Sequence, residues 1–194
     1  TLKPADIGSK SKVNFTFAGN IGKVQNLENI IKAFCLLPNV HQKKSQLNII
    51  GDGSYLDHLI SLASSNRNII FYGKKPRSEM ASYYKVSDFL IISLIDKPIF
   101  SVTVPAKTQT YIAARKPILA IINGDTANII RDNNLGLCAD PSKIEAIVVL
   151  FNRCIEMSQK EIKNFSNENN RLLASIFNKE KSIDKLLRLV LSKD

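Results

Sequence analysis

A chain of 194 residues with 44% hydrophobic side chains is long enough to bury the core of one well-filled α/β domain or of two small ones. No uninterrupted apolar run approaches the roughly 20 residues of a membrane-spanning helix. Residues 1–4 include neither an apolar signal region nor an initiator Met, so we expect a soluble, cytoplasmic piece of a longer protein. The formal net charge of +10 favours anionic partners: nucleoside diphosphates, nucleic acid or an anionic membrane surface.

The three cysteines are typical of buried thiols in a reducing compartment. Cys35, Cys138 and Cys154 are far apart in the sequence, and each lies among apolar neighbours, which argues against a disulfide framework. The chain has only two histidines and no Asp-x-Asp pair. We therefore expect no metal and no cofactor, and we expect protein charges and dipoles to carry any phosphate chemistry.

The first part of the chain repeats one strand-turn-helix unit. Residues 13–18 form a β-type run, and the apolar positions after it recur at helical spacing as far as Pro38. The unit returns with a strand at 47–50, and again with a strand at 68–72 that precedes a helix over 76–86.

The second part contains the run with the most continuous apolar character. Residues 88–94 are apolar at nearly every position, as expected of a central parallel strand that is covered on both faces. After a loop over 95–104, Pro105 begins a helix that runs to about residue 114. The remaining predicted elements are a strand at 117–122, a helix at 126–132, a strand at 135–139 and, beyond Pro141, helices with apolar stripes at 144–151 and 183–191.

This alternation predicts an α/β fold with a doubly wound, Rossmann-like parallel sheet, because right-handed crossovers place helices on both faces. No linker or low-complexity tract interrupts the pattern. We therefore interpret residues 1–194 as one domain, in which residues 142–194 form a helical tail.

Open parallel sheets bind ligands at the carboxyl ends of their strands, so the loops after the strands are the candidate site. In the first loop, Gly19, Asn20, Gly22 and Lys23 precede a helix, and small residues there let backbone amides approach a diphosphate. The alternative, which is equally common, is that the two glycines serve only to let the backbone form this turn.

The next two loops follow the same logic. Gly51 and Gly53 permit a tight turn after the second strand. In the third loop, Tyr72, Gly73 and Lys74 are placed to present backbone amides or an aromatic face to a nucleobase. A purely structural turn is the alternative interpretation of both loops.

The stretch 104–110 is the most specific. A proline-started helix after the central strand directs free amides toward one point, together with Lys107 and Thr108, and such a helix start favours negative charge. The alternative is a lysine on a solvated helix face.

Five segments in order resemble a known family: FAGNIG (17–22), IIGDG (49–53), IFYG (70–73), YKVSD (84–88) and AARKPI (113–118). Together they resemble the C-terminal, donor-binding half of retaining GT-B glycosyltransferases of group 1 type, over nearly the whole chain. The segment VPAKTQTY (104–111) further resembles the branch that transfers amino sugars such as L-fucosamine in bacterial surface-polysaccharide synthesis, of capsule or lipopolysaccharide.

The resemblance implies that this half binds a nucleotide sugar, taken as UDP-linked, and that a separate N-terminal domain binds the acceptor. Transfer to the acceptor hydroxyl would retain the anomeric configuration, with loop amides and Lys107 stabilising the leaving group instead of a metal. The half alone would bind donor without catalysing transfer. The implied partners are the N-terminal domain, the nucleotide sugar, and a lipid-linked acceptor at the anionic inner face of the membrane, with no nucleic acid. The implied diphosphate contacts are Gly19, Asn20, Gly22, Lys23, Lys107 and Thr108, and the implied nucleoside contacts are Gly51, Gly53, Tyr72, Gly73 and Lys74.

The chain departs from the family pattern at several positions. Many members carry two glutamates eight positions apart where this chain has Val102 and Thr110, a basic pair where it has Asn20 and Gln25, and a glycine at Arg115. No catalytic residue is assigned. Two other functions stay open: half of a sugar-nucleotide epimerase, whose carboxylate and histidine constellation is not visible, or a basic module for nucleic acid or anionic membrane, although its basic residues are dispersed and lack interleaved aromatics.

Overall fold

The structure is a computed structural model that describes residues 11–175. The apolar stripe predicted at 183–191 lies outside the described residues. Within residues 11–175, no helix is both long enough and apolar enough to cross a membrane.

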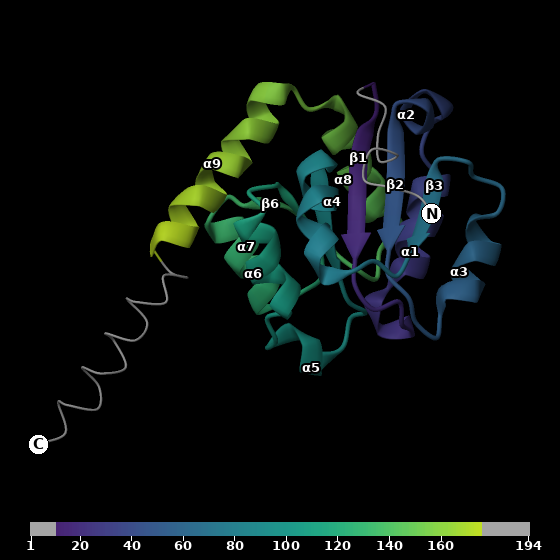
Figure 1. The fold of residues 1–194 in the computed structure, drawn as a ribbon, viewed down its shortest axis with the longest axis horizontal. Coiled ribbons are helices and arrows are strands. Elements are labelled where there is room, and N and C mark those ends of the chain that lie inside the picture. Colours follow the sequence, from purple (N-terminus) through teal and green to yellow (C-terminus); the bar gives the residue numbers. More distant parts are fainter. Residues whose placement is uncertain (1–10, 176–194) are drawn as a thin grey trace, which may run out of the picture.

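Six strands form one fully parallel sheet in the order β3-β2-β1-β4-β5-β6 (Figure 1). This is the predicted doubly wound sheet, because the strand order reverses between β1 and β4. Every residue of β2, β4 and β5 is buried, and this burial explains the nearly continuous apolar sequences of β4 and β5. The strands are β1 (Val13–Ala18), β2 (Ser45–Ile50), β3 (Ile69–Gly73), β4 (Phe89–Ser93), β5 (Ile118–Ile121) and β6 (Gly136–Ala139).

The helices cover both faces of the sheet. Helices α1, α3 and α8 contribute to the core on one face, and α4, α6 and α7 pack on the other (Figure 1). Helix α9 packs against α6. The helices are α1 (Leu27–Cys35), α2 (Asn39–Lys43), α3 (Leu56–Ala63), α4 (Met80–Val86), α5 (Pro98–Ser101), α6 (Ala106–Ala113), α7 (Asp125–Asp132), α8 (Ile144–Glu156) and α9 (Gln159–Ser175), with 3₁₀ turns η2 (Lys23–Gln25) and η3 (Arg77–Glu79).

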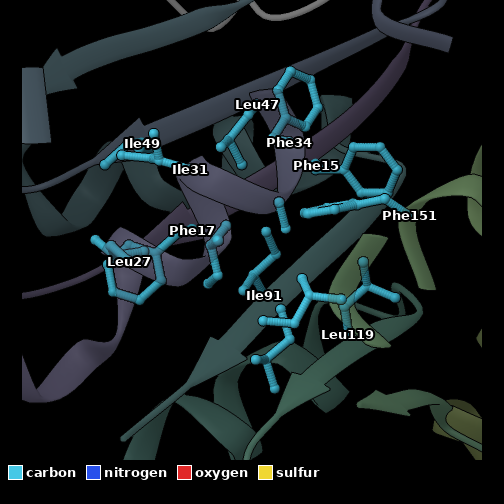
Figure 2. Packing of buried hydrophobic residues seen from close by; sticks show 14 of the residues in the cluster. Phe15, Phe17, Leu27, Ile31, Phe34, Leu47, Ile49, Ile91, Leu119 and Phe151 are labelled. Atoms are coloured by element: carbon cyan, nitrogen blue, oxygen red, sulfur yellow. The ribbon is translucent and has the colours of Figure 1, made fainter. Parts of the chain in front are cut away.

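Aromatic rings fill the centre of the larger core. Phe15 of β1 lies 4.8 Å from Phe151 of α8 and 5.4 Å from Phe89 of β4, measured between ring centroids, and Phe34 of α1 completes the cluster (Figure 2). Phe15 stacks on Phe89, and the other pairs meet edge-to-face; both arrangements add to the free energy gained by burying the rings. The cluster holds α1 and α8 against the two central strands.

Two short helices were not predicted. Helix α2 follows Pro38 directly, and α5 lies inside the loop that the sequence placed at 95–104. Each has too few residues to display a helical period. Pro105 is the N-cap of α6 and not its first helical residue. Arg115, where many family members carry glycine, has a left-handed backbone with φ +57.

The loops at the carboxyl edge of the sheet approach one another closely. Gly51 has φ +143, and a Cβ atom added there would overlap the carbonyl oxygen of Gly19. Gly73 also has a positive φ, +67, but its surroundings are open. Of these two, Gly51 is therefore required to be glycine by a neighbouring backbone as well as by its own conformation, and Gly73 by its conformation alone.

Gly51→Ala is accordingly expected to destabilise the protein much more than Gly73→Ala. The methyl group at position 51 must displace the first loop, whereas at position 73 it meets only the backbone cost of about 1 to 2 kcal/mol. Urea unfolding followed by circular dichroism compares the free energies of unfolding. Equal losses in the two variants would contradict the close approach of the first two loops.

Candidate functional site

An open pocket of about 520 Å³ lies at the carboxyl edge of the sheet. The ends of β1 and β2, the residues after β3 and one side of α4 form its walls, which places it over the β3-β2-β1 side of the sheet, next to the point where the strand order reverses. The residues that line it are Ala18, Gly19, Asn20, Ile50, Gly51, Asp52, Gly53, Lys74, Lys75, Arg77, Met80 and Tyr84.

Backbone hydrogen bonds join the three loops that enclose this pocket. The Gly19 amide donates to the Ile50 carbonyl oxygen at 2.9 Å, and the Ile21 amide donates to that of Asp52 at 2.9 Å. The Gly51 amide donates to the Gly73 carbonyl oxygen at 3.0 Å. The loops are therefore held as one rim, and the predicted meeting of these loops at one edge is confirmed.

A second set of bonds supports the rim from the α1 and α3 side. The Tyr55 amide donates to the Ile21 carbonyl oxygen at 3.0 Å, and the Tyr55 hydroxyl donates to the Glu28 carboxylate at 2.6 Å. Hydrogen bonds from Lys32, and then from Tyr55, lower the pKa of Glu28 to about 2. Glu28 therefore stays ionised at neutral pH and connects α1 to the start of α3.

Lys107 reaches the same edge from α6. Its Nζ lies 3.9 Å from the centroid of the Phe17 ring. A Cβ atom added at Gly19 would lie 3.0 Å from the same Nζ. No ion pair or hydrogen bond to Lys107 is present within the described part of the chain. Burial lowers the pKa of Lys107 to about 8, so the ammonium group is charged at neutral pH but poorly solvated.

The start of α6 adds polar groups next to Lys107. Thr108 is fully buried, and its Oγ1 has no hydrogen-bond partner among the described residues. Free backbone amides in the first turn of a helix carry partial positive charge. The first loop, the α6 start and Lys107 together make this part of the edge suitable for an anion.

The predicted diphosphate contacts Lys107 and Thr108 are not part of the pocket lining, although Lys107 lies beside Gly19, which is. The other predicted contacts differ in their placement. Asn20 lines the pocket, but the Gly22 amide already donates to Gln25 Oε1 at 2.9 Å. Lys23 is exposed on η2 and is not part of the lining. Gly51, Gly53 and Lys74 line the pocket. Gly73 does not, but its carbonyl oxygen accepts the hydrogen bond from the Gly51 amide that joins two loops of the rim.

The prediction that Tyr72 presents an aromatic face to a nucleobase is not supported by its position. Tyr72 is buried, its hydroxyl donates to Asn48 Oδ1 at 3.2 Å, and its ring packs edge-to-face on Tyr83. It points into the layer beneath α4, because alternate residues of a strand face opposite sides of the sheet.

Several residues that line the pocket were missed. Met80 and Tyr84 lie one turn apart on α4, so the helical period of this segment was the available signal. Burial raises the pKa of the Tyr84 hydroxyl. Lys75 and Arg77 belong to the basic run after β3, of which only Lys74 was selected. Asp52 is the acidic residue of the lining, and it accepts a hydrogen bond from the Gly53 amide.

The positions at which many family members carry glutamates are on the surface. Val102 is 69% exposed in the segment after α5, and Thr110 is exposed on α6. Neither lines the pocket. No carboxylate at these positions therefore neutralises Lys107.

The thiols and possible metal ligands are dispersed. All three cysteines are free, and burial raises the pKa of Cys154 to about 12, which keeps this thiol protonated. Within residues 11–175, no three His, Cys, Asp or Glu side chains gather as a metal-binding group.

Lys107→Met is expected to stabilise the protein at pH 7 by about 1 to 3 kcal/mol, because methionine fills the site without a desolvated charge. The pKa of Lys107 is about 8 in the folded protein and 10.5 in its ordinary environment. Between these values the unfolded chain binds a proton that the native state lacks, so the stability of the wild type rises with pH and the advantage of Lys107→Met shrinks.

Urea unfolding at pH 7, 8, 9 and 10 measures this difference. Lys163→Met, at an exposed position of α9, is the control and should change stability little at any pH. A Lys107→Met variant less stable than the wild type at pH 7 would show that the ammonium group is paired.

Comparison with known proteins agrees with this architecture. The model of the family described as glycosyl transferases group 1 matches residues 3–172. Over 152 residues, the chain is 29% identical to the probable glycosyltransferase WbjE of Pseudomonas aeruginosa, in an alignment that covers 76% of this chain and 37% of WbjE. The chain thus spans well under half the length of that relative.

Solved structures show the same fold. HepE from Anabaena, in complex with UDP, superposes with a TM-score of 0.75 at 14% identity, over 95% of this chain and 50% of HepE. The C-terminal domain of LpcC, a group 1 glycosyl transferase from Francisella tularensis, superposes with a TM-score of 0.67 at 17% identity, over 86% of this chain and 87% of that domain. With a family match over residues 3–172 and a doubly wound sheet that carries a pocket at its carboxyl edge, the chain belongs to the group 1 glycosyltransferase family.

Proposed function

We propose that this chain is the donor-binding half of a retaining glycosyltransferase and that it binds a nucleoside-diphosphate sugar in the pocket at the carboxyl edge. The observation that carries this proposal is Lys107, whose partly buried ammonium group has no carboxylate partner among residues 11–175 and lies beside the glycine of the first loop. A buried, unneutralised cation is costly to the fold, and such groups are concentrated at functional sites.

A diphosphate supplies the charge that this site lacks. Its oxygens would accept hydrogen bonds from Lys107 and from the amides at the start of α6, next to the first loop. The charge that develops on the leaving diphosphate during transfer would be stabilised by the same groups. In this proposal the protein's own cation and dipoles carry that role, without a divalent metal.

The rest of the pocket is suited to the nucleoside. Met80 and Tyr84 provide apolar and aromatic surface from α4, and the glycines at 51 and 53 let a ligand approach the backbone. The basic residues Lys74 and Arg77 stand at the same wall. We take uridine as the base, an assignment that draws support from the UDP seen in the similar HepE structure.

The acceptor site is proposed to lie in another part of a longer protein. The chain covers 37% of WbjE and 50% of HepE, which leaves room in such proteins for a second half of similar size. Residues 104–111 are the basis for proposing an amino-deoxy sugar and a surface polysaccharide acceptor. The isolated chain should therefore bind donor without transferring sugar.

Binding of UDP and uridine by isothermal titration calorimetry tests the proposal. Lys107→Ala is expected to weaken UDP binding about ten- to a hundredfold, because it removes a charge-assisted contact of roughly 1.5 to 3 kcal/mol. Uridine, which has no phosphate, should be affected much less. Lys163→Ala removes the same charge from an exposed position of α9 and should leave both affinities unchanged.

Two further arms distinguish the other functions. A chelator should not change UDP affinity if no metal takes part, and an oligonucleotide of similar charge should bind more weakly than UDP. Equal losses for UDP and uridine in Lys107→Ala, or no loss for either, would remove Lys107 from the diphosphate site. Preferential binding of the oligonucleotide would favour a basic nucleic-acid module instead.

The affinity for UDP should also fall as the pH rises above 8. Lys107 loses its proton with a pKa of about 8 in the free protein, and a bound diphosphate favours the charged form. The second phosphate pKa is about 6, so the diphosphate of UDP keeps a constant charge above pH 7, and uridine measured over the same pH range accounts for ionisation of the uracil ring. Calorimetry between pH 7 and pH 10 should show this decline in the wild type, and a similar decline in Lys107→Ala would assign it to another group.

A further inference from the structure

Tyr111 is a fully buried residue of α6 that does not line the pocket. Its hydroxyl donates to the Ala18 carbonyl oxygen at 3.2 Å and accepts from the Ala18 amide at 3.1 Å. One side-chain group thus pairs both polar atoms of the last residue in β1. Burial raises the pKa of Tyr111, so the hydroxyl keeps its proton and can act as a donor.

This contact replaces missing strand pairing. The register between β1 and β4 ends with Thr16 and Leu90, whereas β1 remains paired with β2 as far as Ala18 and Ile50. Ala18 is only 6% exposed, so its backbone groups on the β4 side would otherwise be buried without partners. Where β1 and β4 separate, the Tyr111 hydroxyl makes the hydrogen bonds to Ala18 that a neighbouring strand would otherwise make.

The same residue sets the position of the proposed diphosphate contact. Lys107 lies four residues before Tyr111 on α6, and residues at this spacing project from one face of a helix. When the hydroxyl holds α6 to the end of β1, the Lys107 ammonium is placed over the Phe17 ring and beside Gly19. The Tyr111 ring also packs edge-to-face on Tyr84, with centroids 5.4 Å apart, and Tyr84 lines the pocket.

We propose that Tyr111 is a positioning residue for donor binding, which fixes the distance between Lys107 and the first loop through its paired hydrogen bonds to Ala18. The inference rests on the proposed function, because it explains how the site for a nucleoside diphosphate is kept in register. Tyr111 touches no ligand in this arrangement and acts through the placement of α6.

Tyr111→Phe tests this role, because it keeps the ring and removes only the hydroxyl. UDP affinity should fall about tenfold, as expected for a misaligned charge-assisted contact, while uridine affinity changes less than twofold. The pKa of Lys107, followed by NMR of ¹³C-labelled lysine with Lys107→Met to assign the signal, should rise from about 8 toward 10.5 as the ammonium group becomes hydrated.

Thr16→Val is the matched control. Thr16 is also fully buried in β1, where its hydroxyl accepts a hydrogen bond from Ser87 at 2.6 Å, away from the pocket. Its loss should lower stability without changing UDP affinity or the pKa of Lys107. Replacement of Tyr111 by 4-aminophenylalanine restores a group that donates and accepts, and it should recover UDP affinity even if Tyr111→Phe folds poorly.

The outcomes separate this inference from the proposed function. If Lys107→Ala weakens UDP binding while Tyr111→Phe changes neither UDP affinity nor the pKa of Lys107, the function stands and the positioning role is overturned. If the wild type does not bind UDP, the proposed function is wrong. In that case the pKa of Lys107 is the one measurement that still tests whether Tyr111 positions Lys107. A rise in Tyr111→Phe then supports positioning, and an unchanged value overturns it.

Discussion

Strands β1 and β4 pair side by side only as far as Thr16 and Leu90, and beyond this pair β1 stays paired with β2 while β4 stays paired with β5. In an open parallel sheet this separation makes room for a ligand, but it also deprives the last peptide of β1 of a strand partner. The Tyr111 hydroxyl satisfies that peptide. Because Tyr111 belongs to α6, the contact that completes the sheet also places the helix that carries Lys107.

The position of Lys107 lowers the stability of the fold at this edge of the sheet. Its ammonium group is buried against Phe17, and the attraction of the aromatic face offsets only part of the lost hydration. Val102 and Thr110 stand where many family members carry glutamates, so no carboxylate at these positions neutralises the lysine, and the proposed diphosphate would meet no such competitor. The surrounding core, centred on Phe15 and Phe151, is large enough to tolerate a locally unfavourable charge.

The family match and the shared fold account for this arrangement at the level of architecture. The alignment covers 37% of WbjE, so that relative has further sequence beside the part that this chain matches. The chemistry of the pocket depends on this chain's own residues, which the shared fold does not specify. The pocket has a rim of three hydrogen-bonded loops and one wall formed by α4, where Met80 and Tyr84 are part of the lining.

The sequence by itself determined the sheet: all six strands lie within two residues of their predicted bounds, because apolar runs between glycine and proline breaks are local signals. It also determined that the loops after β1, β2 and β3 meet, since parallel strands end at one edge. Only the tertiary structure decided which side chains face the pocket. Tyr72 turns beneath α4 while Tyr84 lines the pocket, and Lys107 reaches Gly19 while Lys23 points to solvent. These choices depend on packing between segments distant in the chain, as does the bond from Tyr111 to Ala18, which no local pattern of residues encodes.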